Sequence, residues 1–131
     1  MRLRLRPLAL RRLAVLALLS AFVAPATSAA TPDKFFNSPS KNIGCQVGGK
    51  SAYCQTFTPL RSVTLSAAGA LKTCSGVRCV GNGPTNAFTL AYGRSVNAGP
   101  FRCTSLLTGM QCIVVRTSHG FRISRAGVTR V

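Results

Sequence analysis

The chain has 131 residues, a formal net charge of +16 and one acidic residue, Asp33, against 17 lysines and arginines. Catalysis by paired carboxylates, including glycoside hydrolysis, needs two acidic groups, so a chain with one acidic residue cannot carry it out. Positive charge with so little compensation attracts polyanions non-specifically.

The first 30 residues have the pattern of a secretory signal. Arginines precede an apolar run at 13–23, and small residues follow it up to Ala30, where we expect cleavage. The run has about 11 residues, and a helix that spans a bilayer needs roughly 20. We therefore expect residues 31–131 to form a single secreted domain without a membrane span, carrying 12 lysines and arginines. Arg11-Arg12 leaves the twin-arginine export route open beside the general one.

Six cysteines form three pairs with spacings of eight, four and eight intervening residues. An exported chain is oxidised, and zinc would need more histidine than the one present, so we expect disulfides and no metal. Local pairing is the favoured connectivity among 15, and the others stay open. The predicted disulfides are Cys45–Cys54, Cys74–Cys79 and Cys103–Cys112.

The two longer cysteine pairs are expected to staple β-hairpins. If the cysteines of each pair lie opposite each other, Gly49-Lys50 form a two-residue turn in the first hairpin. A glycine in first place suits a type II′ turn. The same counting gives the second hairpin a four-residue loop from Leu106 to Gly109, whose last residue can take positive φ. Directly opposed strand residues have Cα atoms about 4.5 Å apart, within disulfide range.

Apolar residues recur with period two in short runs separated by turn residues, which is typical of strands. No run has the length of a convincing amphipathic helix. The fold class predicted is all-β: a small disulfide-stapled antiparallel sandwich or barrel built from hairpins. The expected strands cover 43–47, 52–57, 63–65, 88–92, 101–105, 110–114 and 121–123.

The region from Phe36 to about Ala126 resembles a family of small secreted, cysteine-containing domains of unknown function, mostly from actinobacteria. The residues that carry the resemblance are Phe36, Ser38-Pro39-Ser40, Asn42-Ile43-Gly44-Cys45, Tyr92-Gly93, Phe101-Arg102-Cys103 and Ser118-His119-Gly120-Phe121. The resemblance brings no established activity. This chain departs from the family where Gln55 replaces an aspartate, and it also lacks the family's tryptophan and its Gly-Asp-Thr after the fourth cysteine.

Aromatic residues and the single histidine have two possible roles each. A domain of this size without tryptophan needs its aromatic rings as core, and the alternative is a stacking surface for bases or sugars. His119 lies between Ser118 and Gly120, where we expect a turn residue that bonds backbone; the alternative is a ligand contact. The aromatic residues are Phe35, Phe36, Tyr53, Phe57, Phe88, Tyr92, Phe101 and Phe121.

Arginines near the C-terminus are the candidate polyanion-binding residues. Arg102 and Arg122 each lie between two apolar or cysteine neighbours, so strand alternation turns them outward, and they share a face if their strands are neighbours. Guanidinium groups bind phosphate and carboxylate in bidentate fashion. The full candidate set is Arg102, Arg116, Arg122, Arg125 and Arg130.

These features predict a non-enzymatic, cationic secreted module that uses no cofactor and associates with anionic envelope components or a secreted partner. A Ser-His-Asp triad lacks the group that would orient the histidine, and oxidation removes a cysteine nucleophile. Nucleic acid is expected to bind only non-specifically. The alternative function is an antimicrobial or inhibitory effector that presents Leu106-Leu107-Thr108 to one protein target.

Overall fold

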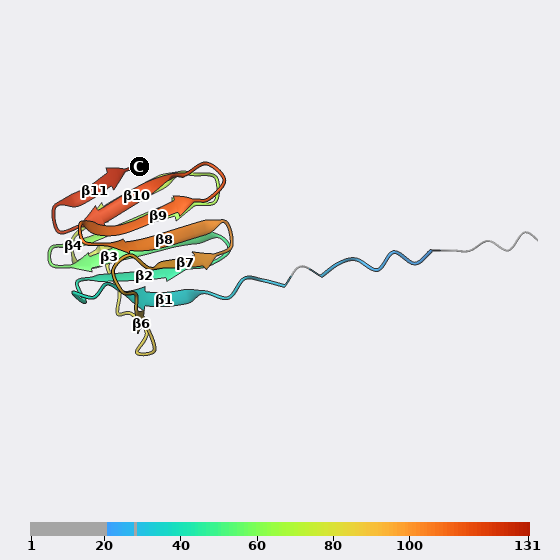
Figure 1. Cartoon of the computed structure of the whole chain (residues 1–131), viewed down its shortest axis with the longest axis horizontal. Helices are drawn as coiled ribbons and strands as arrows, with labels where there is room; N and C mark the ends of the chain where they lie inside the picture. The colour runs from blue at the N-terminus through green and yellow to red at the C-terminus, as the bar shows by residue number, and fades with distance from the viewer. Residues whose placement is uncertain (1–20, 28) are drawn as a thin grey trace, which may run out of the picture.

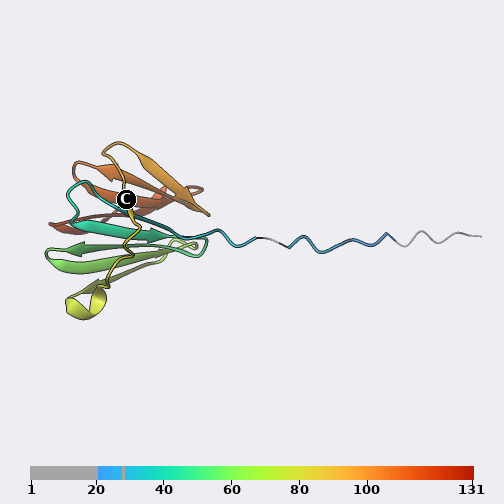
Figure 2. The same ribbon diagram turned by 90° about the horizontal axis from the view of Figure 1, so that it is seen from below.

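Two β-sheets lie face to face in the computed structural model, which describes residues 21–27 and 29–131 (Figures 1 and 2). The arginine-rich start and most of the apolar run of the predicted signal lie outside the described residues. The all-β prediction is confirmed, and the two separate sheets make the fold a sandwich, not a closed barrel. Within the described ranges, no helix is long and apolar enough to cross a membrane.

The first sheet has six strands in the order β5-β4-β3-β2-β1-β6. Neighbouring strands are antiparallel except β1 and β6, which are parallel. A 3-10 turn, η1 (Val77–Cys79), lies outside this sheet (Figure 2). The strands are β1 (Lys34–Asn37), β2 (Ile43–Val47), β3 (Ser51–Phe57), β4 (Leu60–Ser66), β5 (Leu71–Ser75) and β6 (Phe88–Thr89).

The second sheet has five strands in the order β11-β10-β9-β8-β7, and all of its pairings are antiparallel. Each strand joins its neighbour through a short turn, so this sheet is a simple meander. The strands are β7 (Ser95–Ala98), β8 (Phe101–Leu106), β9 (Gly109–Val114), β10 (His119–Ser124) and β11 (Gly127–Arg130).

The predicted cysteine pairs are all confirmed. Cys45 lies opposite Cys54 between β2 and β3, and Cys103 lies opposite Cys112 between β8 and β9. The Cα atoms of each of these two pairs are 4.1 Å apart. The hairpin register deduced from the cysteine spacing is therefore the register of the structure.

Details of the turns differ from the sequence-based expectations. The four-residue loop predicted at 106–109 is wrong, because Leu106 pairs with Gly109 and leaves a two-residue turn. Gly109, at φ 137°, adopts a backbone that continues the ladder one pair further. Gly49 does not take the positive φ of a type II′ turn, so that turn type is also wrong. The strand expected over 88–92 ends at Thr89, since the chain turns at Gly93 with φ 79°.

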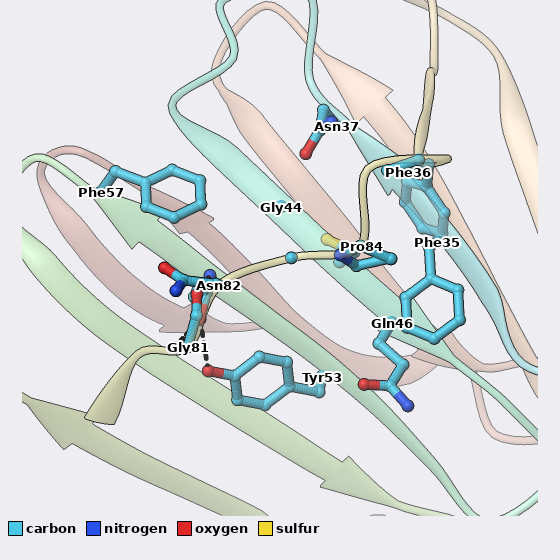
Figure 3. Close-up of a pocket in the computed structure, with 14 residues that line it drawn as sticks. Phe35, Phe36, Asn37, Gly44, Gln46, Tyr53, Phe57, Gly81, Asn82 and Pro84 are labelled. Carbon is cyan, nitrogen blue, oxygen red and sulfur yellow. Dashed lines mark hydrogen bonds between the residues drawn. The ribbon is translucent and has the colours of Figure 1, made fainter. Parts of the chain in front are cut away.

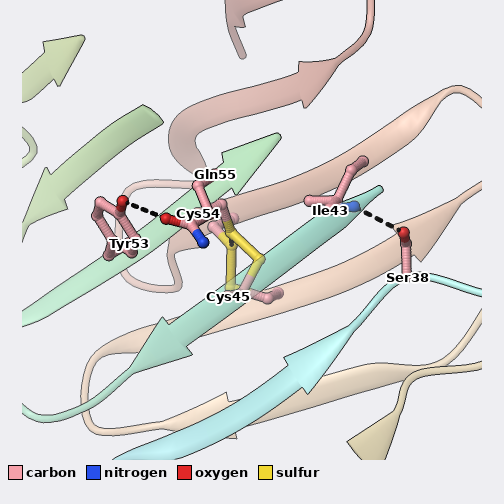
Figure 4. Close-up of a disulfide and its surroundings, with 8 residues drawn as sticks. Ser38, Ile43, Cys45, Tyr53, Cys54 and Gln55 are labelled. Carbon is pink, nitrogen blue, oxygen red and sulfur yellow. Dashed lines mark hydrogen bonds between the residues drawn. A yellow bond between two sulfur atoms is a disulfide. The ribbon is translucent and has the colours of Figure 1, made fainter. Parts of the chain in front are cut away.

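The core lies between the two sheets and is built around two disulfides. The Sγ atoms of Cys54 and Cys112 are 3.7 Å apart, so the staple of the first sheet packs against the staple of the second. All four cysteines of these two bridges are buried. Phe36, Phe101 and Phe121 fill the space around them and are also buried (Figure 4 shows the first bridge and its surroundings).

Not all aromatic residues belong to this core. The side chains of Phe57, Phe88 and Tyr92 are 39%, 47% and 47% exposed, so the expectation that they are core residues is wrong. Phe57 follows the buried Thr56 in β3 and so points to the outward face of the first sheet, and Phe88 lies in the short edge strand β6. These rings remain available at the surface.

Removing a buried staple should cost more stability than removing the exposed one. Cys103→Ala with Cys112→Ala releases a chain constraint of about 2 to 3 kcal/mol, and it also leaves a cavity opposite Cys54 that adds about 1 kcal/mol or more. Cys74→Ala with Cys79→Ala should lose only the constraint, because Cys74 is exposed. Urea unfolding of the two variants measures the difference. Equal losses would contradict a core centred on the two packed disulfides.

Candidate polyanion-binding surface

Arg102 in β8 and Arg122 in β10 lie on the outward face of the second sheet. Each has two fully buried chain neighbours, and side chains alternate between the two faces of a strand, so both arginines point away from the core. The expectation that they turn outward is confirmed. We call this outward face, with Arg102 and Arg122, the basic face.

The two arginines share this face although their strands are not neighbours. Strand β9 runs between them: Arg102 lies opposite Ile113, and Arg122 lies opposite Gln111. Two strand spacings sideways and two residues along the strand put the arginine Cα atoms on the order of 12 Å apart. This spacing lets each arginine bind a separate anionic group, so together they suit a ligand with repeated anionic groups.

Amide side chains on the neighbouring strands hold both guanidinium groups. The Nε of Arg102 donates to Asn97 Oδ1 at 3.1 Å, and the terminal Nη2 of Arg122 donates to Gln111 Oε1 at 2.9 Å. Both partners lie directly opposite their arginine in the register. A guanidinium has five N–H donors, so most donors of each arginine stay free for a ligand while the group is oriented by the sheet.

The other three candidate arginines do not extend the basic face as predicted. Arg116 is in the turn before β10 and Arg125 in the turn after it, so the length of the strand, roughly 20 Å, separates them. Arg130 pairs with Phe121, a core residue, and therefore starts on the opposite side of the sheet. The C-terminal patch of five arginines is thus divided by strand geometry, and only Arg102 and Arg122 share the face.

A lysine of the first sheet lies beside this face. The Nζ of Lys34, in β1, donates to the backbone oxygen of Asn97 at 2.7 Å, and Asn97 is also the partner of Arg102. The contact joins residues 63 positions apart across the two sheets. No local pattern signals it, because the edges of β1 and β7 meet only in the folded sandwich.

The expectation that His119 is a turn residue is wrong: it is the first residue of β10, directly after the turn at 115–118. Its backbone N–H donates to Thr117 Oγ1 at 3.3 Å. The side chain is exposed and lines a hollow of about 360 Å³ with Arg130 and the C-terminal Val131. No acidic side chain lines this hollow among the described residues.

Comparison with known protein families, with characterised proteins and with solved structures finds no match to this chain. Membership of the secreted actinobacterial family therefore stays a prediction.

The contacts of Arg122 predict slow solvent exchange of its Nε proton. This nitrogen is buried and has no hydrogen-bond partner within the described part of the chain, while the same guanidinium is held by Gln111. We expect exchange about tenfold slower than for Arg116, the equivalent of about 1.4 kcal/mol. Gln111→Ala should remove most of this difference. Nitrogen-detected NMR of the arginine side chains measures both rates, and equal rates in the unaltered protein would show that the guanidinium is not held.

Proposed function

We propose that the protein is a non-enzymatic, cationic secreted module that associates with anionic polymers of the cell envelope. The observation that carries this proposal is the basic face, where Arg102 and Arg122 are oriented by amides and have no acidic partner. An anionic chain lying across β8 to β10 can accept charge-assisted hydrogen bonds from both.

The charge of the described chain supports an anionic ligand over a neutral or cationic one. Asp33 is the only acidic side chain, and its Oδ2 accepts a hydrogen bond at 2.7 Å from Gln46 of the first sheet. No carboxylate side chain of the described residues therefore compensates the cations of the second sheet. A surface of one sign raises the local concentration of oppositely charged polymers and speeds their association.

The disulfides support secretion, and the lack of paired carboxylates and of a free thiol among the described residues supports a non-enzymatic function. Three disulfides, with no free cysteine in the described ranges, suit an oxidising compartment and leave no thiol nucleophile there. With a single acidic side chain, the chain cannot supply the paired carboxylates of general acid–base catalysis. Binding is the function that these residues support best.

The second candidate function, a cationic effector with a protein target, has one observation in its favour. Leu107 is 85% exposed at the tip of the β8–β9 hairpin, in the loop segment Leu106-Leu107-Thr108. Leu107, Tyr92 and Arg125 line one hollow of about 360 Å³, which is separate from the hollow at His119. An exposed leucine next to an aromatic ring and a cation suits a protein surface better than a polymer.

Two double variants with equal loss of charge test the envelope proposal. Arg102→Ala with Arg122→Ala should weaken binding to an inorganic polyphosphate of defined length. Log affinity falls as log salt rises, and the double variant should make this slope less steep by about 1.5 between about 50 and 200 mM salt. Lys50→Ala with Lys72→Ala, on the first sheet, should change the slope much less. Lys34 is not a suitable control because it contacts Asn97.

The outcome distinguishes a defined anion-binding site from non-specific charge attraction, and the envelope proposal from the effector function. Equal slope changes in both double variants would mean that no defined anionic site exists. If polyphosphate does not bind at low salt, the envelope proposal fails. A stoichiometric protein complex that resists salt and is lost in Leu107→Ser would favour the effector.

A further inference from the structure

A segment of the chain crosses the outward face of the first sheet. The strands β5 and β6 lie at opposite ends of this sheet, so the connection between them passes β4, β3, β2 and β1. Figure 3 shows residues 81–84 passing in front of Gly44 of β2. We call residues 80–87 the crossing segment.

The side chain of Gln55 in β3 fixes the crossing segment to the sheet, and Tyr53 of the same strand supports Gln55 and holds the residue before the segment. The amide of Gln55 donates from Nε2 to Gly81 O at 2.6 Å and accepts from Gly81 N at 2.9 Å. The hydroxyl of Tyr53 donates to Gln55 Oε1 at 2.8 Å and lies 3.0 Å from Cys79 O. Burial raises the pKa of Tyr53, against a smaller lowering from Ser62, so this hydroxyl stays protonated and continues to donate at neutral pH.

Between the crossing segment and the sheet is a groove of about 290 Å³. The rings of Phe35, Tyr53 and Phe57 surround it (Figure 3). Gly44 forms the floor, where an added Cβ would lie 3.2 Å from Asn37 Oδ1 and 3.6 Å from the ring of Phe57. The volume is close to the lower end, about 300 Å³, of pockets that bind small molecules. We call this the aromatic groove.

The polar groups of the aromatic groove are neutral amides. In the described part of the chain, the side chains of Asn37 and Asn82 have no hydrogen-bond partner, and both line the groove. Gln46 donates from Nε2 to Asp33, which leaves its Oε1 free to accept. Each primary amide offers both donors and an acceptor. No charged side chain lines the groove among the described residues.

We propose that the aromatic groove binds a neutral sugar residue of a glycan. The C–H faces of a pyranose ring pack on aromatic rings, and its hydroxyl groups both donate and accept, as amides require. An anionic ligand would enter a groove without a cation. A wholly apolar ligand would cover the amides of Asn37 and Asn82 without pairing them, which costs about 1 to 3 kcal/mol for each group. A proline-rich peptide offers carbonyl acceptors but no N–H donors at its prolines, so it would leave the amide oxygens of Asn37 and Asn82 unpaired, whereas sugar hydroxyl groups pair both the donors and the acceptors.

This inference is independent of the basic face. The aromatic groove is on the outward side of the first sheet, and Arg102 and Arg122 are on the outward side of the second. A neutral ligand releases no counterions, so its affinity should not depend on salt, in contrast to that of polyphosphate. Salt dependence therefore distinguishes the two ligands.

The test is a titration of the mature chain with neutral trisaccharides of glucose, mannose, galactose and N-acetylglucosamine. The sequence has two tyrosines and no tryptophan, so in a Tyr92→Phe background the fluorescence reports on Tyr53, in the groove. We expect saturable binding of at least one trisaccharide with a Kd of about 1 mM or lower, unchanged between low and high salt.

Two groove variants and one control locate the binding. Phe57→Ala, which removes one wall, should weaken binding by about tenfold or more, the loss of about 1.4 kcal/mol. Gly44→Ala places a methyl group on the floor of the groove, 3.2 Å from Asn37 Oδ1, and should also weaken binding; thermal unfolding of this variant shows whether the fold is kept. Leu60→Ala is the control: Leu60 pairs with Phe57, is 36% exposed and does not line the groove.

Three results would overturn the proposal. The first is no saturable response to any of the four trisaccharides. The second is binding that is unaffected by both Phe57→Ala and Gly44→Ala. The third is trisaccharide binding that is lost in Arg102→Ala with Arg122→Ala, because it would place the sugar on the basic face. Binding of a proline-rich peptide without any trisaccharide would also exclude a sugar site.

Discussion

Two disulfides packed against each other determine how this small domain is built. Each crosses a hairpin, one in each sheet, and the Sγ atoms of Cys54 and Cys112 meet at 3.7 Å in the core. A slip of one residue in a hairpin would turn every side chain to the other face, and a cross-strand bridge forbids that slip. The two bridges therefore also fix which side chains face solvent, and thereby the composition of both outward surfaces.

Those outward surfaces differ in chemistry. On the second sheet, amides from neighbouring strands orient Arg102 and Arg122, which suits a repeated anion. On the first sheet, the crossing segment and three aromatic rings enclose a groove with amides and no charge. The amide of Gln55, which bonds both polar atoms of the Gly81 backbone, keeps this groove in place. Because each surface needs its own sheet, a sandwich can carry both without either site limiting the other.

The sequence alone predicts what depends on local spacing. The cysteine intervals are sufficient to predict the hairpin registers and the disulfides. The alternation of apolar residues around Arg102 and Arg122 is sufficient to predict that both arginines point outward. Contacts between distant segments leave no such pattern: Lys34 meets Asn97 across 63 positions, and Gln55 meets Gly81 across 26. The aromatic groove exists only because β5 and β6 are at opposite ends of one sheet, an order that no local signal specifies.

The central claim is that the two outward faces are separate sites, and simultaneous titration tests it most directly. Backbone amide NMR would follow a neutral trisaccharide added to protein already saturated with polyphosphate. The account predicts that the sugar shifts residues of β2, β3 and the crossing segment, leaves β8 to β10 unchanged, and binds with the same affinity within about twofold, a coupling below about 0.4 kcal/mol. Displacement of one ligand by the other, or sugar-induced shifts centred on Arg102 and Arg122, would contradict it.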